Sequence, residues 1–286
     1  MSDSRTIRDT FNRVAARYDR HAALELEVGR RLLERTGFCR REPRRILDLG
    51  CGTGASSVEL KKKFRRARVI GVDSATMMLA QLQRRASLLR PVSAVCADLS
   101  SLPFPQASAD LVFCNLAAYW SPDPAVLFGE FRRVLQPGGM LLFSTLGPAS
   151  LRELREASSQ AESGLQFPEF PDLLEVGNAL VAAGFSEPVM DMEIITVHYP
   201  SLDALALELE STGTSLLISG WEHWAELKGP LDSASAPRQA GGRVPLTYEI
   251  VYGTAFGPGE GQPRRTAEGD IATFSVESLL KSRRMG

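Results

Sequence analysis

The feature that most constrains the fold of this chain is residues 45–54, which read Arg-Ile-Leu-Asp-Leu-Gly-Cys-Gly-Thr-Gly. A short apolar run that contains Asp48 is followed by Gly50, Gly52 and Gly54, and then by a helical pattern. Open α/β sheets bind nucleotide-like ligands where a buried strand enters such a glycine-rich turn and a helix. Glycine permits the tight turn and lets the backbone approach a ligand closely. The spacing is G-x-G-x-G, which differs from the G-x-G-x-x-G of dinucleotide-binding proteins.

Strands and helices alternate beyond the glycine turn. We expect further strands at 69–73, 92–96, 109–114 and 140–144, with helices at 55–65 and 123–135 between them. Residues 136–139, Gln-Pro-Gly-Gly, predict a turn into the fifth strand, because proline cannot continue a helix and glycine tolerates a positive φ. The alternation predicts an α/β fold with a mostly parallel sheet and right-handed crossovers.

The chain after residue 145 predicts two more strands and a cap. A helix at 172–183 precedes β-rich segments at 188–199 and 246–256, and the simplest topology pairs these as antiparallel sixth and seventh strands. The sheet is then seven-stranded and mostly parallel, with an antiparallel last strand. The predicted divisions are an N-terminal helical lid (1–40), a core (41–199), an inserted helical cap (200–245), the last core strand (246–257) and a flexible tail (258–286). Within the cap, residues 229–242 are rich in Ser, Ala, Pro and Gly and predict a mobile loop.

Polar and apolar candidates for a binding site recur at defined places. Asp73 lies about 20 residues beyond the glycines, where dinucleotide folds place the acid that binds ribose hydroxyls. Asp98 follows the third strand, although aspartate there is often a turn or cap residue. Met78 is either a core residue or covers one face of an adenine with its thioether. Residues 6–36 predict a helix outside the sheet, in which Tyr18 either packs or stacks and hydrogen-bonds over a ligand.

Composition excludes several classes of protein. A net charge of −1 indicates no general attraction to nucleic acid. No apolar run approaches the roughly 20 residues that a membrane span needs, and the polar N-terminus lacks the apolar stretch of a signal peptide. The three histidines are too scattered to predict a metal site. Without C-x-x-C spacing, the cysteines are interpreted as free buried thiols of a cytoplasmic protein; they are Cys39, Cys51, Cys96 and Cys114.

Basic residues gather in two segments. The first covers 30–45 and holds seven arginines, and the second covers 61–68 and holds three lysines and three arginines. Either these are solvated helix faces, or they form a docking surface for an acidic macromolecule that acts on encounter rate and register.

The glycine stretch resembles the first motif of class I methyltransferases, which use S-adenosylmethionine. Five further blocks, at 11–19, 115–120, 143–154, 184–193 and 245–253, resemble the malonyl-acyl-carrier-protein O-methyltransferase family of biotin synthesis. The resemblance runs over roughly residues 7–257. It departs from the family at Tyr119, since the family usually carries glutamine immediately before the tryptophan that stands here as Trp120.

The resemblance implies a class I Rossmann-like fold and S-adenosylmethionine as cofactor. The cofactor residues that it implies, together with Met78, are Tyr18, Asp48, Gly50, Gly52, Gly54, Asp73, Asp98, Leu99 and Asn115. It places Asp98 at the adenine amino group, with a backbone contact from Leu99. The residues expected near the transferred methyl group and the acyl substrate are Tyr18, Tyr119, Trp120 and Arg152.

The implied reaction esterifies the free carboxylate of a malonyl thioester on acyl carrier protein. Carrier protein is acidic, so the basic segments 30–45 and 61–68 become its expected docking surface on a monomeric enzyme. Two alternatives stay open: a methyltransferase for a small quinone-like or polyketide-like acceptor, and a methyltransferase-fold protein that serves as an assembly factor or hydroxylase.

Overall fold

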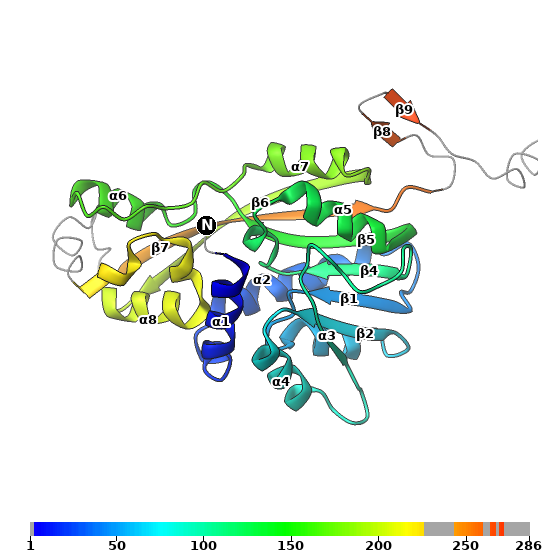
Figure 1. Cartoon of the computed structure of the whole chain (residues 1–286), viewed down its shortest axis with the longest axis horizontal. Helices are drawn as coiled ribbons and strands as arrows, with labels where there is room; N and C mark the ends of the chain where they lie inside the picture. Colours follow the sequence, from blue (N-terminus) through cyan, green and yellow to red (C-terminus); the bar gives the residue numbers. More distant parts are fainter. Residues whose placement is uncertain (1–2, 226–242, 260–263, 267–268, 272–286) are drawn as a thin grey trace, which may run out of the picture.

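A single seven-stranded sheet organises the molecule. The computed structural model describes residues 3–225, 243–259, 264–266 and 269–271. The strands lie in the order β3-β2-β1-β4-β5-β7-β6, and β7 is antiparallel to both of its neighbours while β1 to β5 pair in parallel (Figure 1). The prediction of a mostly parallel sheet with an antiparallel last strand is confirmed. The strands are β1 (Arg45–Leu49), β2 (Arg68–Asp73), β3 (Ser93–Cys96), β4 (Ala109–Cys114), β5 (Leu135–Leu146), β6 (Ser186–Tyr199) and β7 (Val244–Phe256).

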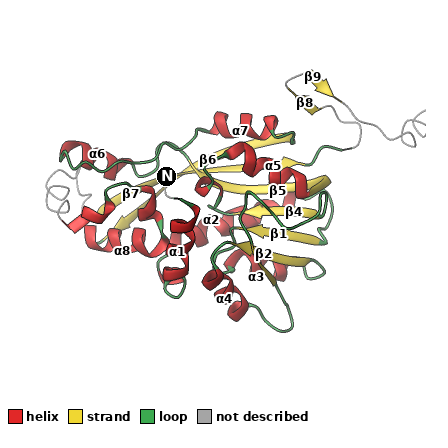
Figure 2. Ribbon diagram, viewed as in Figure 1, coloured by secondary structure: helices red, strands yellow, loops and turns green. Residues whose placement is uncertain are grey.

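Helices cover both faces of the sheet (Figure 2). Successive residues of a strand point to opposite faces, so apolar strands present side chains that need covering on both. Ile46 packs into the core that includes α2 (Ala23–Glu34) and α3 (Ala55–Lys63), together with leucines of α4 (Thr76–Arg85). Leu47, the next residue, packs into the core that includes α5 (Pro124–Val134) and α7 (Leu173–Ala182). The three helices predicted at 55–65, 123–135 and 172–183 are therefore present and cover the sheet.

The predicted helix over 6–36 is instead two helices, α1 (Ser4–Val14) and α2, separated by a 3-10 turn at Tyr18–Arg20. Asp19 in this turn accepts a hydrogen bond from Thr53 at 2.6 Å and pairs with Arg85. These long-range contacts, which apolar spacing does not report, favour the break. Of these two helices, α1 lies outside the sheet's core and packs against α4 and α8 (Leu202–Thr212). Helix α2 packs into the core beside the sheet.

Three further expectations change. Residues 136–139 form an irregular start of β5 rather than a turn before it, with Gly138 at φ +69° and its N–H bonded to the carbonyl of Gly257 at 2.8 Å. Cys96 is exposed rather than buried. In the predicted tail, β8 (Arg264–Thr266) and β9 (Gly269–Ile271) pair as an antiparallel hairpin.

Parts of the predicted cap and tail lie outside the described residues, including all of the loop predicted at 229–242. The described part of the cap is α8 followed by 3-10 turns at Thr214–Leu217 and Trp221–His223. Among the helices that the structure describes, none is both long and apolar enough to cross a membrane.

Candidate active site

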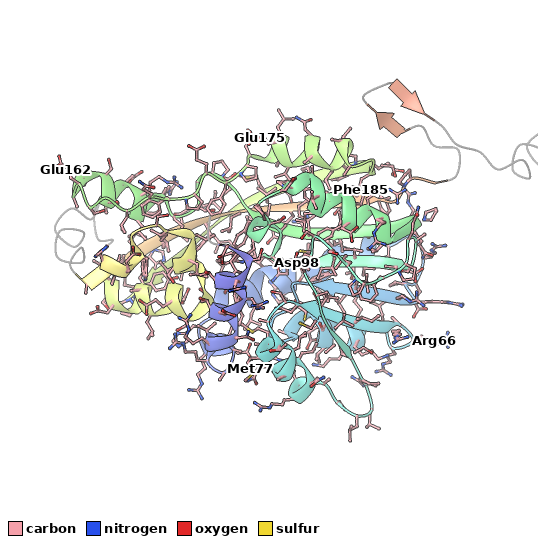
Figure 3. All side chains as sticks on the ribbon, viewed as in Figure 1. Arg66, Met77, Asp98, Glu162, Glu175 and Phe185 are labelled. Carbon is pink, nitrogen blue, oxygen red and sulfur yellow. The ribbon has the colours of Figure 1, made fainter. Side chains whose placement is uncertain are left out.

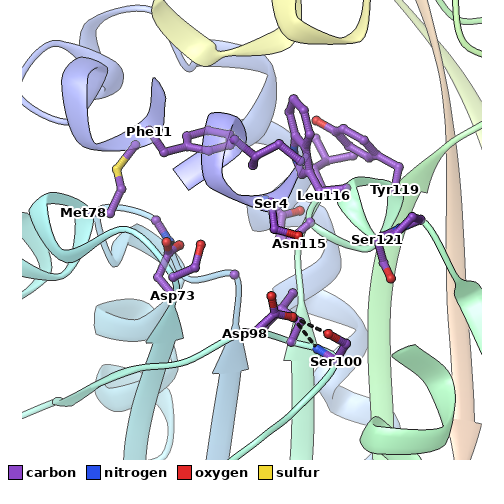
Figure 4. A pocket seen from close by; sticks show the side chains of 18 of the residues that line it. Ser4, Phe11, Asp73, Met78, Asp98, Ser100, Asn115, Leu116, Tyr119 and Ser121 are labelled. Carbon is purple, nitrogen blue, oxygen red and sulfur yellow. Dashed lines mark hydrogen bonds between the residues drawn. The ribbon is translucent and has the colours of Figure 1, made fainter. Parts of the chain in front are cut away.

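A cavity of about 330 Å³ lies at the carboxyl edge of the sheet, beside α1 (Figure 4). Parallel strands bring the turns that follow β1, β2 and β4 to this one edge, which is where open α/β sheets bind ligands. The predicted site residues that line the cavity are Tyr18, Gly50, Gly52, Asp73, Met78, Asp98, Leu99, Asn115, Tyr119 and Trp120. Three others do not line it: Asp48, Gly54 and Arg152.

The glycine turn presents bare backbone to the cavity. Gly50 and Gly52 have φ of +68° and +53°, which residues with a Cβ rarely adopt. A Cβ on Gly50 would lie 2.2 Å from the Cβ of Ala117, whereas a Cβ on Gly52 would meet nothing within 4 Å. Gly54 has a structural role, since a Cβ there would lie 2.0 Å from Leu82. The turn can therefore approach a ligand at Gly52 and is locked against its neighbours at Gly54.

Asp48 is buried below this turn and does not face the cavity. Its carboxyl accepts a hydrogen bond from the hydroxyl of Ser57 on α3. Burial raises the pKa of Asp48 to about 7, and the nearby charge of Asp73 adds to the rise. We interpret Asp48 as a link between β1 and α3 rather than as a ligand contact.

Asp73 and Asp98 carry carboxylates into the cavity from the ends of β2 and β3. The Gly52 N–H donates to Asp73 Oδ2 at 2.9 Å and the Ala75 N–H donates to Oδ1 at 2.8 Å, so the carboxylate is fixed in place. Asp98 Oδ1 accepts from the Ser100 N–H at 2.8 Å, and among described residues no hydrogen bond engages its Oδ2. Burial raises the pKa of Asp73, while its backbone donors favour the charged form. Both carboxylates retain acceptor capacity for ligand hydroxyl or amino groups.

The opposite end of the cavity is an aromatic wall. The rings of Phe11 and Trp120 meet edge to face at 5.3 Å, and those of Tyr119 and Trp120 lie 5.1 Å apart. Phe170 extends the wall behind Tyr119, at 6.0 Å. The apolar spacing of 6–36 included Phe11, but it could not reveal that this face of α1 would line a cavity.

Asn115 and Leu116 form the floor between the two ends. The Asn115 amide donates to the carbonyl of Glu25 at 2.9 Å and accepts from Ser144 Oγ at 2.9 Å. Leu116 has φ +48°, and its N–H donates to Ser144 Oγ at 2.9 Å. A non-glycine residue held at positive φ marks stored backbone strain, which is common at functional sites.

The charged groups of the described lining are all acidic: Asp73, Asp98 and Asp123. Arg152, predicted to contact the substrate, begins α6 (Arg152–Gln160) outside the cavity, with its side chain 54% exposed and 3.2 Å from Glu153.

The basic segment 30–45 is largely occupied by contacts within the molecule. Arg31, Arg35 and Arg40 reach across to acids of β6, namely Glu193, Asp191 and Glu187. Arg30 pairs with Glu27 and Glu34 on its own helix. These arginines lie on α2 (Arg31), in the 3-10 turn that follows it (Arg35) and in the next loop (Arg40); we name the three cross-pairs the α2–β6 ion-pair ladder.

The second basic segment lies at the amino edge of the sheet, because α3 ends at Lys63 and β2 begins at Arg68. Figure 3 shows Arg66 at the end of the sheet remote from Asp98. Six residues of β2 at about 3.3 Å each separate the two edges by roughly 20 Å. This placement argues against the segment as a docking surface for a substrate that enters the cavity.

The sheet order and the cavity define a class I S-adenosylmethionine-dependent methyltransferase. A methyltransferase domain model matches residues 47–143. A putative methyltransferase from Bacillus halodurans has the same fold, with a TM-score of 0.58 at 19% identity over 79% of this chain and 98% of its own.

Similarity over nearly the whole chain narrows this class. A malonyl-[acyl-carrier protein] O-methyltransferase of Halorhodospira halophila is 39% identical, covering 99% of this chain and 97% of the relative. The protein of the same name from a Methylovorus species is 38% identical over 90% of each. The chain belongs to the malonyl-[acyl-carrier protein] O-methyltransferase family.

Proposed function

We propose that this enzyme transfers the methyl group of S-adenosylmethionine to the free carboxylate of a malonyl group carried by acyl carrier protein, as in biotin synthesis. The observation that carries the proposal is the near full-length similarity to relatives of that name. The described chain also supports it: one end of the cavity offers acceptors and bare backbone, and the other offers an aromatic compartment.

The lining fits S-adenosylmethionine. We assign Asp73 to the ribose hydroxyls, since a carboxylate accepts from both hydroxyls of a diol, and Asp98 to the adenine amino group. Met78 and Leu99 supply apolar contacts to the base, and the turn at Gly50–Gly52 takes the amino-acid part. The cofactor supplies an electrophilic methyl group on a sulfonium, which leaves as a neutral thioether.

The acceptor needs no general base. A carboxylate with a pKa near 4 is already ionised at neutral pH, so no proton moves when its oxygen bonds to the methyl carbon. Catalysis then rests on alignment and exclusion of water, which can supply several kcal/mol. The aromatic wall formed by Phe11, Tyr119 and Trp120 suits this step, because the negative acceptor and the positive donor become neutral products. We propose that the hydroxyls of Tyr18 and Tyr119 orient the acceptor carboxylate.

We infer that the carrier protein docks at the mouth of the cavity and not on the two basic segments 30–45 and 61–68. Arg5 and Arg8 of α1 are exposed, and they flank Ser4 and Ile7, which line the cavity. An acidic carrier that docks there places its acyl arm at the opening. Charged groups around a binding site act mainly on encounter and register.

The test offers labelled S-adenosylmethionine with malonyl-carrier protein, malonyl-coenzyme A and succinyl-carrier protein in parallel. Transfer that favours malonyl-carrier protein and gives a base-labile ester supports the proposal. Tight binding of the cofactor without transfer to any malonyl thioester contradicts it.

A further inference from the structure

Glu25, in the first turn of α2, is a half-buried acid that the reaction described above does not use. Its backbone carbonyl holds Asn115 on the cavity floor at 2.9 Å. Its Oε2 atom is enclosed, with no hydrogen-bond partner among the described residues. A buried polar atom without a partner is costly, so such an atom needs an explanation.

Four groups on other elements interact electrostatically with the Glu25 carboxyl, and none of them is a cation. They are Tyr18 of the 3-10 turn, Tyr119 after β4, Tyr248 of β7, and Glu208 of α8. Glu208 accepts a hydrogen bond from the hydroxyl of Tyr199 of β6 and lies near His21. Two of the tyrosines, Tyr18 and Tyr119, also line the cavity. The carboxyl of Glu25 thus acts electrostatically on two tyrosines of the lining, and its backbone carbonyl holds the cavity floor at Asn115.

We propose that Glu25 is a positioning residue whose protonation decides whether the acceptor end admits an anionic acyl group. When Glu25 is protonated and neutral, the hydroxyls of Tyr18 and Tyr119 are free to bind the acceptor carboxylate. When Glu25 is ionised, its charge repels that carboxylate and attracts the two hydroxyls. The inference rests on the proposed function, because a carboxylate acceptor is what makes the charge matter. The ester product carries no charge at this point and is not held.

The electrostatics place this change near neutral pH. Burial raises the pKa of Glu25 to about 7, against a lowering by its own backbone N–H, and the charge of Glu208 adds to the rise. The ionised fraction therefore grows as pH rises above 7. Because kcat/KM reports groups of the free enzyme, its value for a carboxylate acceptor should fall about tenfold per pH unit above that point.

The experiment measures kcat/KM for malonyl-carrier protein from pH 6 to 9 with the wild type, Glu25→Gln and the control Glu34→Gln. Glu34 lies at the exposed end of the same helix, where its ion pair among the described residues is with Arg30. We expect the wild type and Glu34→Gln to lose activity with rising pH, and Glu25→Gln to show a flat profile. At pH 8.5, which is 1.5 units above a pKa of about 7, the variant should exceed the wild type about thirtyfold, a gain that misfolding cannot produce.

Cofactor affinity across the same pH range separates this effect from titration of Asp48 below the glycine turn, which would move cofactor binding instead. A Glu25→Gln profile that falls like the wild type overturns the inference, and so does a folded, cofactor-binding Glu25→Gln that is inactive at every pH. If Glu25→Gln fails to fold, Glu25→Asp provides the test. Its kcat/KM should still fall with rising pH, but with a midpoint at a different pH from that of the wild type. A midpoint at the same pH overturns the inference. A wild type that methylates no malonyl thioester at any pH overturns the proposed function itself, and the inference with it.

Discussion

The two ends of the cavity are built in opposite ways. At the cofactor end, backbone N–H groups already fix Asp73, and Gly54 is locked against Leu82 before any ligand is considered. Toward the acceptor end, Glu25 Oε2 has no partner in the described part of the chain, and the floor between the ends holds the strained Leu116. The first end has its carboxylate and its turn fixed by neighbouring groups, whereas the second has an unsatisfied carboxyl oxygen beside it. Affinity for the shared cofactor and selection of the acceptor can therefore change independently.

The largest expected effect is at the turn that supports the cofactor end. Gly54→Val places a side chain 2.0 Å from Leu82 at φ +81°, and overpacking plus a left-handed backbone should lower the free energy of unfolding by about 4 kcal/mol. Urea denaturation measures it. The matched control is Gly129→Ala in α5, where an added Cβ meets nothing within 4 Å and helix propensity should raise stability by about 1 kcal/mol. An equal change in the free energy of unfolding for the two variants would show that this end is not rigidly packed.

Asp48 should make stability depend on pH. Its folded pKa of about 7 lies above the unfolded value of 3.8, so its stabilising contribution is complete below pH 3.8 and is lost as pH rises through 7. Asp48→Asn should remove this loss, becoming more stable relative to the wild type by about 3 kcal/mol between pH 4 and pH 8. Thermal or urea unfolding of both proteins at several pH values checks it. A constant difference would mean that Asp48 is ionised in the folded protein.

Asp73→Ala should break the cofactor end without touching the acceptor end. Losing a charged acceptor costs about 1.5–3 kcal/mol, so the Kd for S-adenosylmethionine should rise by roughly tenfold to a hundredfold. Calorimetric titration measures it, and the KM for the acyl substrate at saturating cofactor should stay the same. A parallel rise in that KM would show that the ends are coupled.

The mouth of the cavity gives a smaller, salt-dependent effect. The double reversal Arg5→Glu and Arg8→Glu should raise the KM for malonyl-carrier protein about tenfold at low salt, with little change for malonyl-coenzyme A. The matched reversal of Lys62, Lys63 and Arg66, at the far edge of the sheet, should change neither. If the reversal of Lys62, Lys63 and Arg66 raised this KM and the reversal of Arg5 and Arg8 did not, the second basic segment would be the docking surface.

The smallest effect belongs to the hydroxyl of Tyr119. Tyr119→Phe keeps the ring against Trp120 and removes one donor, so kcat/KM for the acyl substrate should fall about fivefold, while cofactor affinity is unchanged. Tyr119→Gln retains donors and should recover part of the loss. Identical rates in all three proteins would leave the residue as a space-filling part of the wall.

Sequence predicted that the glycine turn, Asp73 and Asp98 would meet at one edge of the sheet, because their placement is set locally by the strands. The glycine turn, Asp73 and Asp98 each follow a strand, and parallel strands must end at one edge. The acceptor end could not be predicted in the same way. Phe11, Glu25 and Phe170 come from separate elements that only packing brings together, and Arg152, expected to contact the substrate, lies outside the cavity lining. The break at Tyr18–Arg20 was missed for a similar reason, since Asp19 is held by contacts more than thirty residues away.

The α2–β6 ion-pair ladder bears on self-association of the protein at high concentration. The outer strand β6 is fourteen residues long, lies at the edge of the sheet and exposes Val189, Met192 and Ile194. A long apolar edge invites a second strand to add to it, and charged side chains along the edge oppose such addition. The ladder keeps three acids and three arginines along this margin, and charges at a strand edge oppose the addition of a second strand. Salt screens exposed charges, so we expect this protection of the β6 edge to weaken at high ionic strength.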